Sequence, residues 1–284
     1  MRKKRKGIIA LLLAGLLLFG TVPGNLAGAD TVIPVYAAEK TETSITDNKN
    51  GTFTVVYDNT EAAKIVVMVT KDGVSYKYYL SEGVVTEVIP MTLGNGSYKI
   101  RICKNITGTK YSVRYSETLE VDLKNENEVF TNPHIIVDYE MKEKAVKKAT
   151  SLCKKYKTDT TKITKIYNYL VKNYSYDYAK VDVVRDTVGY IPNVAQTYTD
   201  KMGICYDISS LFAAMLRSQG IIAKVVTGYT PSIDTLHAWN EVYDAKKKQW
   251  YVIDVTSDIA YYQAGVSYKM KKDKDDYKSI KYYH

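Results

Sequence analysis

Cys205, His237 and Asp254 are residues whose types and order along the chain could perform nucleophilic catalysis. A cysteine thiol attacks a carbonyl carbon after a histidine removes its proton, and a carboxylate can hold that imidazole in the required orientation. Cys205 stands where a loop is predicted to become a helix, and the free N–H groups and the dipole of a helix N-terminus favour thiolate over thiol. The three residues therefore predict acyl-transfer chemistry.

The surroundings of these residues favour catalysis over a structural role. A single helical cysteine is usually a buried apolar residue, but Cys205 is followed by both a base and a carboxylate. Asp254 is bounded by apolar residues, so it needs a partner to offset its desolvation, and His237 is the natural one. Trp239 alternates with His237 on one side of a predicted strand, so we expect Trp239 to shield the ion pair or to pack beside it in the cleft.

Acyl transfer also requires donors for the oxyanion that forms when the thiolate attacks. The backbone N–H of Cys205 is one candidate. The side chain of Gln196 or of Tyr198 is a candidate for the second donor, although either residue could instead cap a helix or pack. Asp207, two residues after Cys205, is expected to stabilise the helix N-terminus rather than to act in catalysis.

The first part of the chain reads as short strands separated by turns. No helical pattern interrupts them, and Lys71-Asp-Gly73 and Gly94-Asn-Gly96 supply turns. This pattern predicts a small antiparallel β-sandwich of immunoglobulin or fibronectin type, whose expected role is that of a spacer or docking module. The predicted strands are Thr52–Tyr57, Lys64–Thr70, Tyr76–Leu80, Val84–Ile89, Ser97–Cys103 and Tyr111–Val121.

After a polar segment at Asp122–His134, which is predicted to be a linker, the apolar period becomes helical. Thr160 or Asp159 is the expected N-cap of the second helix. Ser175–Pro192 shows no pattern and is expected to be a loop that flanks the cleft. The predicted helices are Met141–Tyr156, Asp159–Asn173, Asn193–Thr199 and Cys205–Gln219, and the predicted strands are Ile221–Tyr229, His237–Tyr243 and Trp250–Val255.

Three segments resemble the core of the transglutaminase-like superfamily: Gly203–Tyr229, His237–Tyr243 and Trp250–Thr256. The resemblance is close from Asn193 to Asp258 and looser over Ile166–Tyr178. It implies an α+β, papain-like fold in which a helix that carries the cysteine packs on an antiparallel sheet. It also implies a cysteine protease or amidase, or a transglutaminase that forms crosslinks. One departure is Val255, where many relatives carry proline.

The chain begins with the pattern of a secretory signal peptide. Five basic residues precede an apolar run from Ile8 to Phe19, which is too short to span a bilayer comfortably. We predict cleavage after Ala37, with Ala29 as an alternative site and a retained membrane anchor as the competing interpretation. The expected location is therefore secreted or at the cell surface, with no stable membrane span after cleavage.

Charge gives little indication of a polyanionic partner. Removal of residues 1–37 leaves 35 basic and 30 acidic residues, a net charge of +5. Lysines crowd the C-terminal end, but aspartates are mixed among them, so a solvated face is expected rather than a nucleic-acid site. The expected partners are a peptide or protein substrate, including cell-envelope proteins, and the expected oligomeric state is a monomer.

Three cysteines and three histidines limit the other chemistries. Cys103 and Cys153 are expected to be buried and apolar, although a bridge between them is an alternative. His134 and His284 are not placed to share a metal with His237, so no metal and no cofactor are expected.

The predicted organisation is a signal peptide at 1–37, a β-sandwich at 38–124 and a catalytic domain at 125–284. The predicted function is acyl transfer from peptide or protein carboxamides. The alternative is a non-catalytic, envelope-associated binding or adhesion module that keeps the fold. The β-sandwich and the 27 tyrosines of the chain are what favour that alternative.

Overall fold

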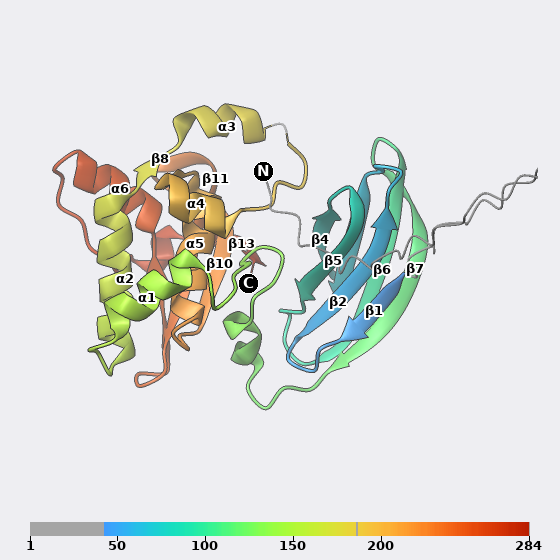
Figure 1. Cartoon of the computed structure of the whole chain (residues 1–284), viewed down its shortest axis with the longest axis horizontal. Coiled ribbons are helices and arrows are strands. Elements are labelled where there is room, and N and C mark those ends of the chain that lie inside the picture. Colours follow the sequence, from blue (N-terminus) through green and yellow to red (C-terminus); the bar gives the residue numbers. More distant parts are fainter. Residues whose placement is uncertain (1–42, 186, 284) are drawn as a thin grey trace, which may run out of the picture. The chain divides into compact units, whose positions relative to one another are not determined.

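The computed structural model describes residues 43–185 and 187–283. The predicted signal peptide lies outside the described residues. Strands β1–β7 come first along the chain and are followed by a part in which helices alternate with strands (Figure 1). The fold is therefore of the α+β class that the sequence predicts.

Strands β1–β7 form two antiparallel sheets, one in the order β1-β2-β5 and one in the order β4-β3-β6-β7. Phe53, Val67 and Ile100 are wholly buried in a shared core, because alternate residues of each strand point inward. The six predicted strands are present; β1 was not predicted. The immunoglobulin or fibronectin type stays a prediction. The strand bounds are β1 Ser44–Asp47, β2 Thr52–Asn59, β3 Ile65–Lys71, β4 Val74–Leu80, β5 Gly83–Pro90, β6 Gly96–Thr107 and β7 Lys110–Val121.

The segment after β7, predicted to be a linker, is packed. Its 3-10 helix, η1 Glu126–Thr131, buries Val129 and Phe130. The side-chain amide of Asn132 donates to the carbonyl of Asn50 at 3.0 Å, and the N–H of Ile135 donates to the carbonyl of Val88 at 2.9 Å. The segment is thus part of the folded structure, while the domain limits at 124 and 125 stay a prediction.

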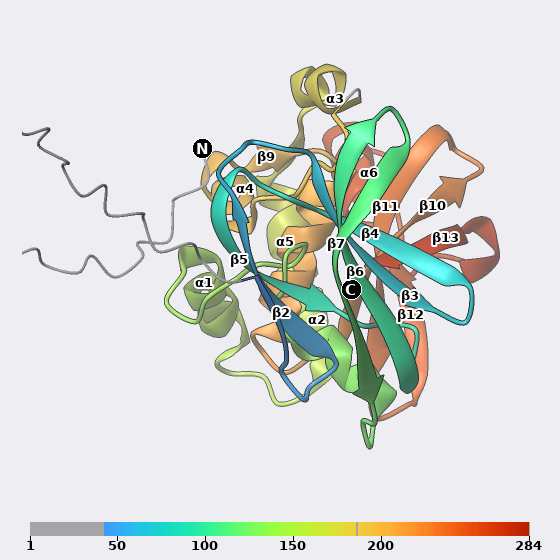
Figure 2. The same cartoon turned by 90° about the vertical axis from the view of Figure 1, so that its right-hand side faces the viewer.

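Helix α5 is the centre of the second part, and residues Asp207–Arg217 along it are all buried. It packs against strands β10 and β11 and against helices α1, α2, α4 and α6 (Figure 2). A helix covered on every side is rigid, so its first residue, Cys205, is held in place. The helix bounds are α1 Lys144–Cys153, α2 Asp159–Asn173, α3 Tyr178–Arg185, α4 Val194–Asp200, α5 Cys205–Arg217 and α6 Val255–Gln263.

The sheet beside α5 is antiparallel and has the strand order β12-β11-β10-β13. Asn240 of β11 ties this sheet to α5, because its side-chain amide donates to the carbonyl of Ser209 at 3.0 Å. Two short strands, β8 Ser175–Tyr176 and β9 Met202–Gly203, pair in parallel just before the helix. The sheet strands are β10 Ala223–Thr230, β11 Ile233–Asp244, β12 Gln249–Ile253 and β13 Lys278–Tyr283.

Three local predictions differ from the structure. The segment predicted as the Ser175–Pro192 loop contains β8 and α3. The N-cap of α2 is Thr158, not Thr160 or Asp159. Strand β12 ends at Ile253, so Asp254 does not lie within a strand but caps α6, which was not predicted. The aspartate before Val255 leaves the sheet because its carboxylate satisfies an N–H in the first turn of that helix.

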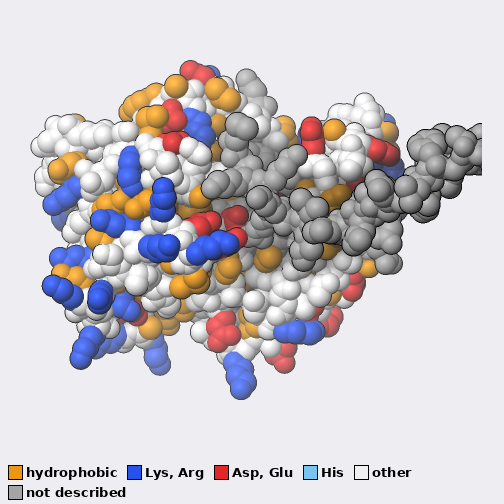
Figure 3. Space-filling model, in the orientation of Figure 1, with side chains coloured by type: hydrophobic (Ala, Val, Ile, Leu, Met, Phe, Trp, Pro, Cys, Tyr) orange, Lys and Arg blue, Asp and Glu red, His pale blue; other side chains and the backbone are white. Residues whose placement is uncertain are grey.

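Lysine side chains gather over the face that carries α1 and α2 (Figure 3). Lys144, Lys147, Lys155 and Lys172 are exposed there.

Among the residues that the structure describes, no helix is long and apolar enough to cross a membrane.

Candidate active site

The backbone before α5 holds Cys205 at the helix N-terminus. Ser175 and Tyr176 of β8 pair with Met202 and Gly203 of β9. At Gly203 a Cβ atom would lie 2.8 Å from Cβ of Asp207, so only glycine allows the chain to pass this close to the helix. Cys205 is half-buried.

Asp207 has the structural role that the sequence predicts for it. Its carboxylate, which has no exposed surface, accepts from the N–H of Ile204 at 3.1 Å and from Nζ of Lys180 at 2.7 Å. The hydroxyl of Tyr190 also donates to this carboxylate. Asp207 therefore fixes the N-terminus of the cysteine helix and ties it to α3 and to the chain that follows α3.

His237 and Asp254 form a buried pair. Nε2 of His237 lies 2.8 Å from Oδ2 of Asp254, and the two residues are 4% and 0% exposed. Strand β11 presents His237 opposite Gly228 of β10, and the start of α6 presents Asp254. Since Nε2 is used by Asp254, Nδ1 is the ring nitrogen left for Cys205, whose side chain is near enough to help raise the pKa of the imidazole.

The electrostatics favour a protonated imidazole. Burial alone lowers the pKa of His237, but hydrogen bonds to Asp254 and Cys205 outweigh it and raise that pKa to about 10. Burial raises the pKa of Asp254, but the hydrogen bonds from His237 and Ser257 outweigh it and hold that pKa below its usual value. The site is thus set for an imidazolium between a carboxylate and a thiol.

Asp254 is held by partners that sequence reasoning missed. Oδ1 accepts from the N–H of Ser257 at 3.0 Å, and Oδ2 accepts from Oγ of Ser257 at 2.6 Å and from the hydroxyl of Tyr277 at 3.0 Å. The Asp-x-x-Ser spacing at 254–257 is that of an N-cap and its N3 residue, a signal that could have revealed Ser257. No sequence signal connects Tyr277 to Asp254.

In the structure the side chains of Gln196 and Tyr198, the expected oxyanion donors, have other partners. Gln196 is exposed and its amide donates to Asp200 at 2.7 Å. The ring of Tyr198 packs 3.7 Å from Nζ of Lys201. Trp239 does lie beside His237, with ring centroids 6.2 Å apart, but it is wholly buried and therefore shields the pair without lining the cleft.

Tyr176 of β8 interacts with Cys205, and sequence reasoning missed it. Burial, followed by electrostatic repulsion from Cys205, raises the pKa of Tyr176 to about 12. Its hydroxyl therefore stays protonated at neutral pH. The side chain also lies near enough to Cys205 to interact with it electrostatically. The Tyr-Ser-Tyr-Asp-Tyr run at 174–178 was the available signal.

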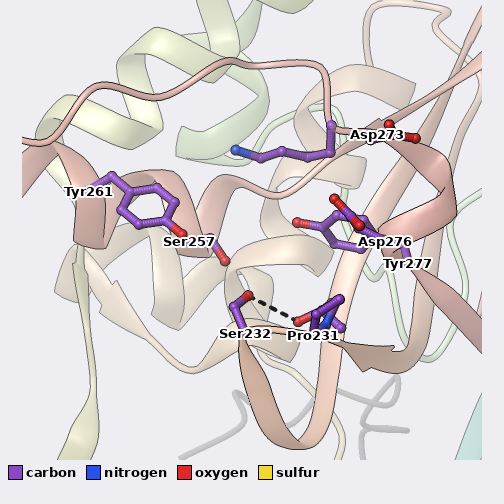
Figure 4. A pocket seen from close by; sticks show the side chains of 9 residues that line it. Pro231, Ser232, Ser257, Tyr261, Asp273, Asp276 and Tyr277 are labelled. Carbon is purple, nitrogen blue, oxygen red and sulfur yellow. Dashed lines mark hydrogen bonds between the residues drawn. The ribbon is translucent and has the colours of Figure 1, made fainter.

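A cavity of about 250 Å³ is lined by Ser257 and Tyr277, two of the residues that bind Asp254. The hydroxyls of Ser257 and Tyr277 face it (Figure 4). The two groups that hold the buried carboxylate therefore also line a cavity. Its other lining residues are Thr230, Pro231, Ser232, Tyr261, Lys272, Asp273 and Asp276.

Cys103 and Cys153 are buried free thiols, as predicted, and no bridge joins them. Burial raises the pKa of both thiols, which disfavours the reactive thiolate. Among the described residues, no group of three or more His, Cys, Asp or Glu side chains is arranged to hold a metal ion.

Residues 146–255 match the Transglutaminase-like superfamily, and Cys205, His237 and Asp254 fall within the match. Similar solved structures include a candidate cysteine protease from Cytophaga hutchinsonii, with 17% identity over 87% of this chain and 73% of that chain and a TM-score of 0.45. The periplasmic domain of TgpA from Pseudomonas aeruginosa is 15% identical over 75% of this chain and 74% of that chain, with a TM-score of 0.35. Red sea bream transglutaminase is 12% identical over 72% of this chain and 48% of that chain, with a TM-score of 0.30. No curated protein matches the chain.

Proposed function

We propose that this chain, whose residues 146–255 belong to the transglutaminase-like superfamily, is an exported thiol-dependent acyl-transfer enzyme that acts on peptide or protein carboxamides. The observation that carries the proposal is the buried pair of His237 and Asp254, joined through Nε2 at 2.8 Å, with Cys205 near enough to help raise the pKa of the imidazole. Acyl transfer needs a nucleophile, a base and an orienting carboxylate. Cys205, His237 and Asp254 can supply these three groups.

In the first half-reaction the sulfur of Cys205 bonds to the carbonyl carbon of the substrate. The C–N bond then breaks, and the proton on Nδ1 of His237 passes to the departing amine. A thioester remains on Cys205. Asp254 keeps its negative charge throughout, because its pKa is held low, and stabilises the imidazolium until the proton leaves.

In the second half-reaction an acceptor attacks the thioester carbon and gives its proton to His237. Water as the acceptor releases an acid and makes the enzyme a protease or amidase. A lysine amine as the acceptor forms a new amide and makes it a crosslinking transglutaminase. In both cases the thiolate and imidazolium are restored.

The tetrahedral intermediate places a negative charge on the former carbonyl oxygen. The N–H of Cys205 lies in the first turn of α5, where helix geometry provides no acceptor within the helix. Tyr176 is our candidate for the second donor, in place of Gln196 and Tyr198, because its hydroxyl stays protonated beside Cys205.

Export is supported by the basic and apolar pattern at the N-terminus. We place the mature enzyme outside the cytoplasm, as a secreted or cell-surface protein. N-terminal sequencing of protein recovered from the medium and from the cell envelope tests this proposal: a first residue at position 38 supports cleavage after Ala37, and an intact Met1 contradicts it.

The activity is tested with quenched fluorescent peptides that contain glutamine, each assayed with and without a fluorescent primary amine. Peptide cleavage or ammonia release without amine incorporation identifies water as the acceptor, and amine incorporation identifies a transglutaminase. Cys205→Ala must abolish either activity, whereas Cys153→Ala, which removes a buried thiol, must not. Turnover that survives in Cys205→Ala contradicts the mechanism.

A further inference from the structure

Tyr277 donates to the same carboxylate oxygen that binds His237. Its hydroxyl lies 3.0 Å from Oδ2 of Asp254, and Nε2 of His237 lies 2.8 Å from that atom. We infer that Tyr277 is a positioning residue, which sets the orientation of Asp254 and, through it, the strength with which His237 holds its proton. This inference rests on the proposed function, since it assigns Tyr277 a part in the same reaction.

Tyr277 comes from a part of the chain beyond the family match, which ends at residue 255. It directly precedes β13, which pairs antiparallel with β10 at the edge of the catalytic sheet. Ser257, the other side-chain donor besides His237, lies one helical turn after Asp254 and is a local partner. Tyr277 reaches Asp254 only because β13 joins the sheet.

Close packing fixes Tyr277 at both its ring and its backbone. The ring packs edge-on against Trp239, with centroids 5.0 Å apart, and Trp239 lies beside His237. Gly228 lies close to Lys278, the residue after Tyr277. A Cβ atom at Gly228 would come within 2.1 Å of the Lys278 carbonyl oxygen. Glycine at 228 therefore lets this segment approach β10 closely enough for the hydroxyl to reach Asp254.

The hydroxyl acts on Asp254 as a donor. Burial, with repulsion from Asp254, raises the pKa of Tyr277, so the phenol keeps its proton. A carboxylate that receives this bond carries less charge toward His237 and cannot rotate freely. Without the bond, the carboxylate would hold the imidazolium more strongly and in a less defined orientation, so delivery of the proton to the departing amine would slow.

Other titratable groups near Asp254 keep their own partners when the phenol is removed. Asp258 of α6 is bound by Lys272 and by the hydroxyl of Tyr167 at 2.7 Å. Cys205 interacts with His237 and is not among the groups that shift the pKa of Tyr277. Tyr261 of α6 interacts electrostatically with Tyr277. A change in His237 after substitution of Tyr277 can therefore be assigned to Asp254.

The matched pair of variants is Tyr277→Phe and Tyr261→Phe. Both lose one hydroxyl from the same cavity wall, and the aromatic ring retained in Tyr277→Phe would still pack on Trp239, so both should fold. With only three histidines in the chain, the ring signal of His237 can be assigned by its loss in His237→Ala and followed by NMR across pH. In Tyr277→Phe the titration midpoint should rise by about half a pH unit or more, and kcat should fall about tenfold with little change in KM.

Tyr261→Phe should leave both the titration midpoint of His237 and kcat as in the wild type. An unmoved His237 midpoint in Tyr277→Phe overturns the inference, and a fall in kcat with an unmoved midpoint overturns it as well, because packing alone would then explain the loss. The NMR titration needs no turnover. If the wild type proves inactive, the proposed function fails while the titration still decides the role of Tyr277.

Discussion

Nε2 of His237 is bound to Oδ2 of Asp254 at 2.8 Å, so the imidazole can serve Cys205 only through Nδ1. The carboxylate thereby selects the tautomer, because Nε2 must carry a proton to donate to Asp254. Nδ1 is left to accept the thiol proton and later to return it to the departing amine. One hydrogen bond thus fixes the direction of proton transfer in the proposed reaction.

Activity should fall in alkaline solution as His237 loses its proton. The folded-state pKa of His237 is raised to about 10, so the imidazolium persists up to that pH and is lost above it. In Asp254→Asn the bond and the charge that raise this pKa are removed, so the alkaline limb of kcat/KM should move to lower pH. The maximal rate should also fall by about 10²- to 10⁴-fold.

A profile of kcat/KM between pH 5 and pH 11 measures both effects. Asp182→Asn is a suitable control. The exposed carboxylate of Asp182 pairs with the exposed Arg185 and has no part in the proposed reaction. An alkaline limb that stays in place in Asp254→Asn would exclude Asp254 as the partner that sets the imidazole pKa.

Tyr176→Phe tests the proposed oxyanion donor. Removal of one such donor typically lowers kcat by about 10²- to 10³-fold, and KM should change little because the bond strengthens only as the oxyanion forms. Tyr178→Phe is the matched control, since Tyr178 packs edge-on against Tyr176 but is 74% exposed. Equal rates in the two variants would remove Tyr176 from the oxyanion site.

Asp207→Ala should destabilise the protein and loosen the cysteine helix. The substitution leaves Lys180, Tyr190 and the N–H of Ile204 without the buried oxygens that they bind. Loss of such bonds costs roughly 1–3 kcal/mol. Urea denaturation followed by circular dichroism gives the free energy of unfolding; a value equal to that of the wild type would show that the Asp207 contacts are not stabilising.

The packed segment before α1 should be required for a stable catalytic domain. Arg217, buried near the end of α5, donates to the carbonyl of Asn132 at 2.7 Å and contacts Nε2 of His134 at 2.9 Å. A fragment of residues 138–284 lacks both partners and leaves a buried guanidinium partly unpaired. It should be cut faster by protease than a fragment of residues 125–284.

Equal protease resistance of the two fragments would mean that Arg217 does not need this segment. Failure of the 125–284 fragment to fold, with the full chain folded, would contradict the predicted boundary at residue 125. The readout in both cases is the rate of cleavage under native conditions, so catalytic activity is not needed.

Sequence patterns single out Cys205, His237 and Asp254, the proposed nucleophile, base and carboxylate, because these residues lie in or beside strongly patterned segments. Cys205 opens an apolar helix, and His237 follows the alternation of a strand. The patterns fail where tertiary contacts decide the structure. Asp254 leaves its strand to cap α6, because Ser257 offers an N–H and a hydroxyl, and an apolar run alone does not show this.

Long-range partners are the other part that sequence cannot supply. Tyr277 meets Asp254 only through the pairing of β13 with β10, and Lys180 meets Asp207 only because α3 forms in a segment without apolar periodicity. Gln196 was expected near the oxyanion from its position before Cys205. It is exposed because α4 turns that face outward and Asp200 binds its amide.

The rate of alkylation of Cys205 at neutral pH, in the wild type and in His237→Ala, tests the proposed triad most directly. Iodoacetamide is neutral and reacts with thiolate, so the rate follows the thiolate fraction. Mass spectrometry of tryptic peptides separates Cys205 from Cys103 and Cys153. We expect Cys205 in the wild type to react much faster at neutral pH than the buried Cys103 and Cys153, and His237→Ala to lose most of this difference because the thiol no longer has its base. Equal rates of alkylation of Cys205 in the wild type and in His237→Ala would contradict the catalytic triad.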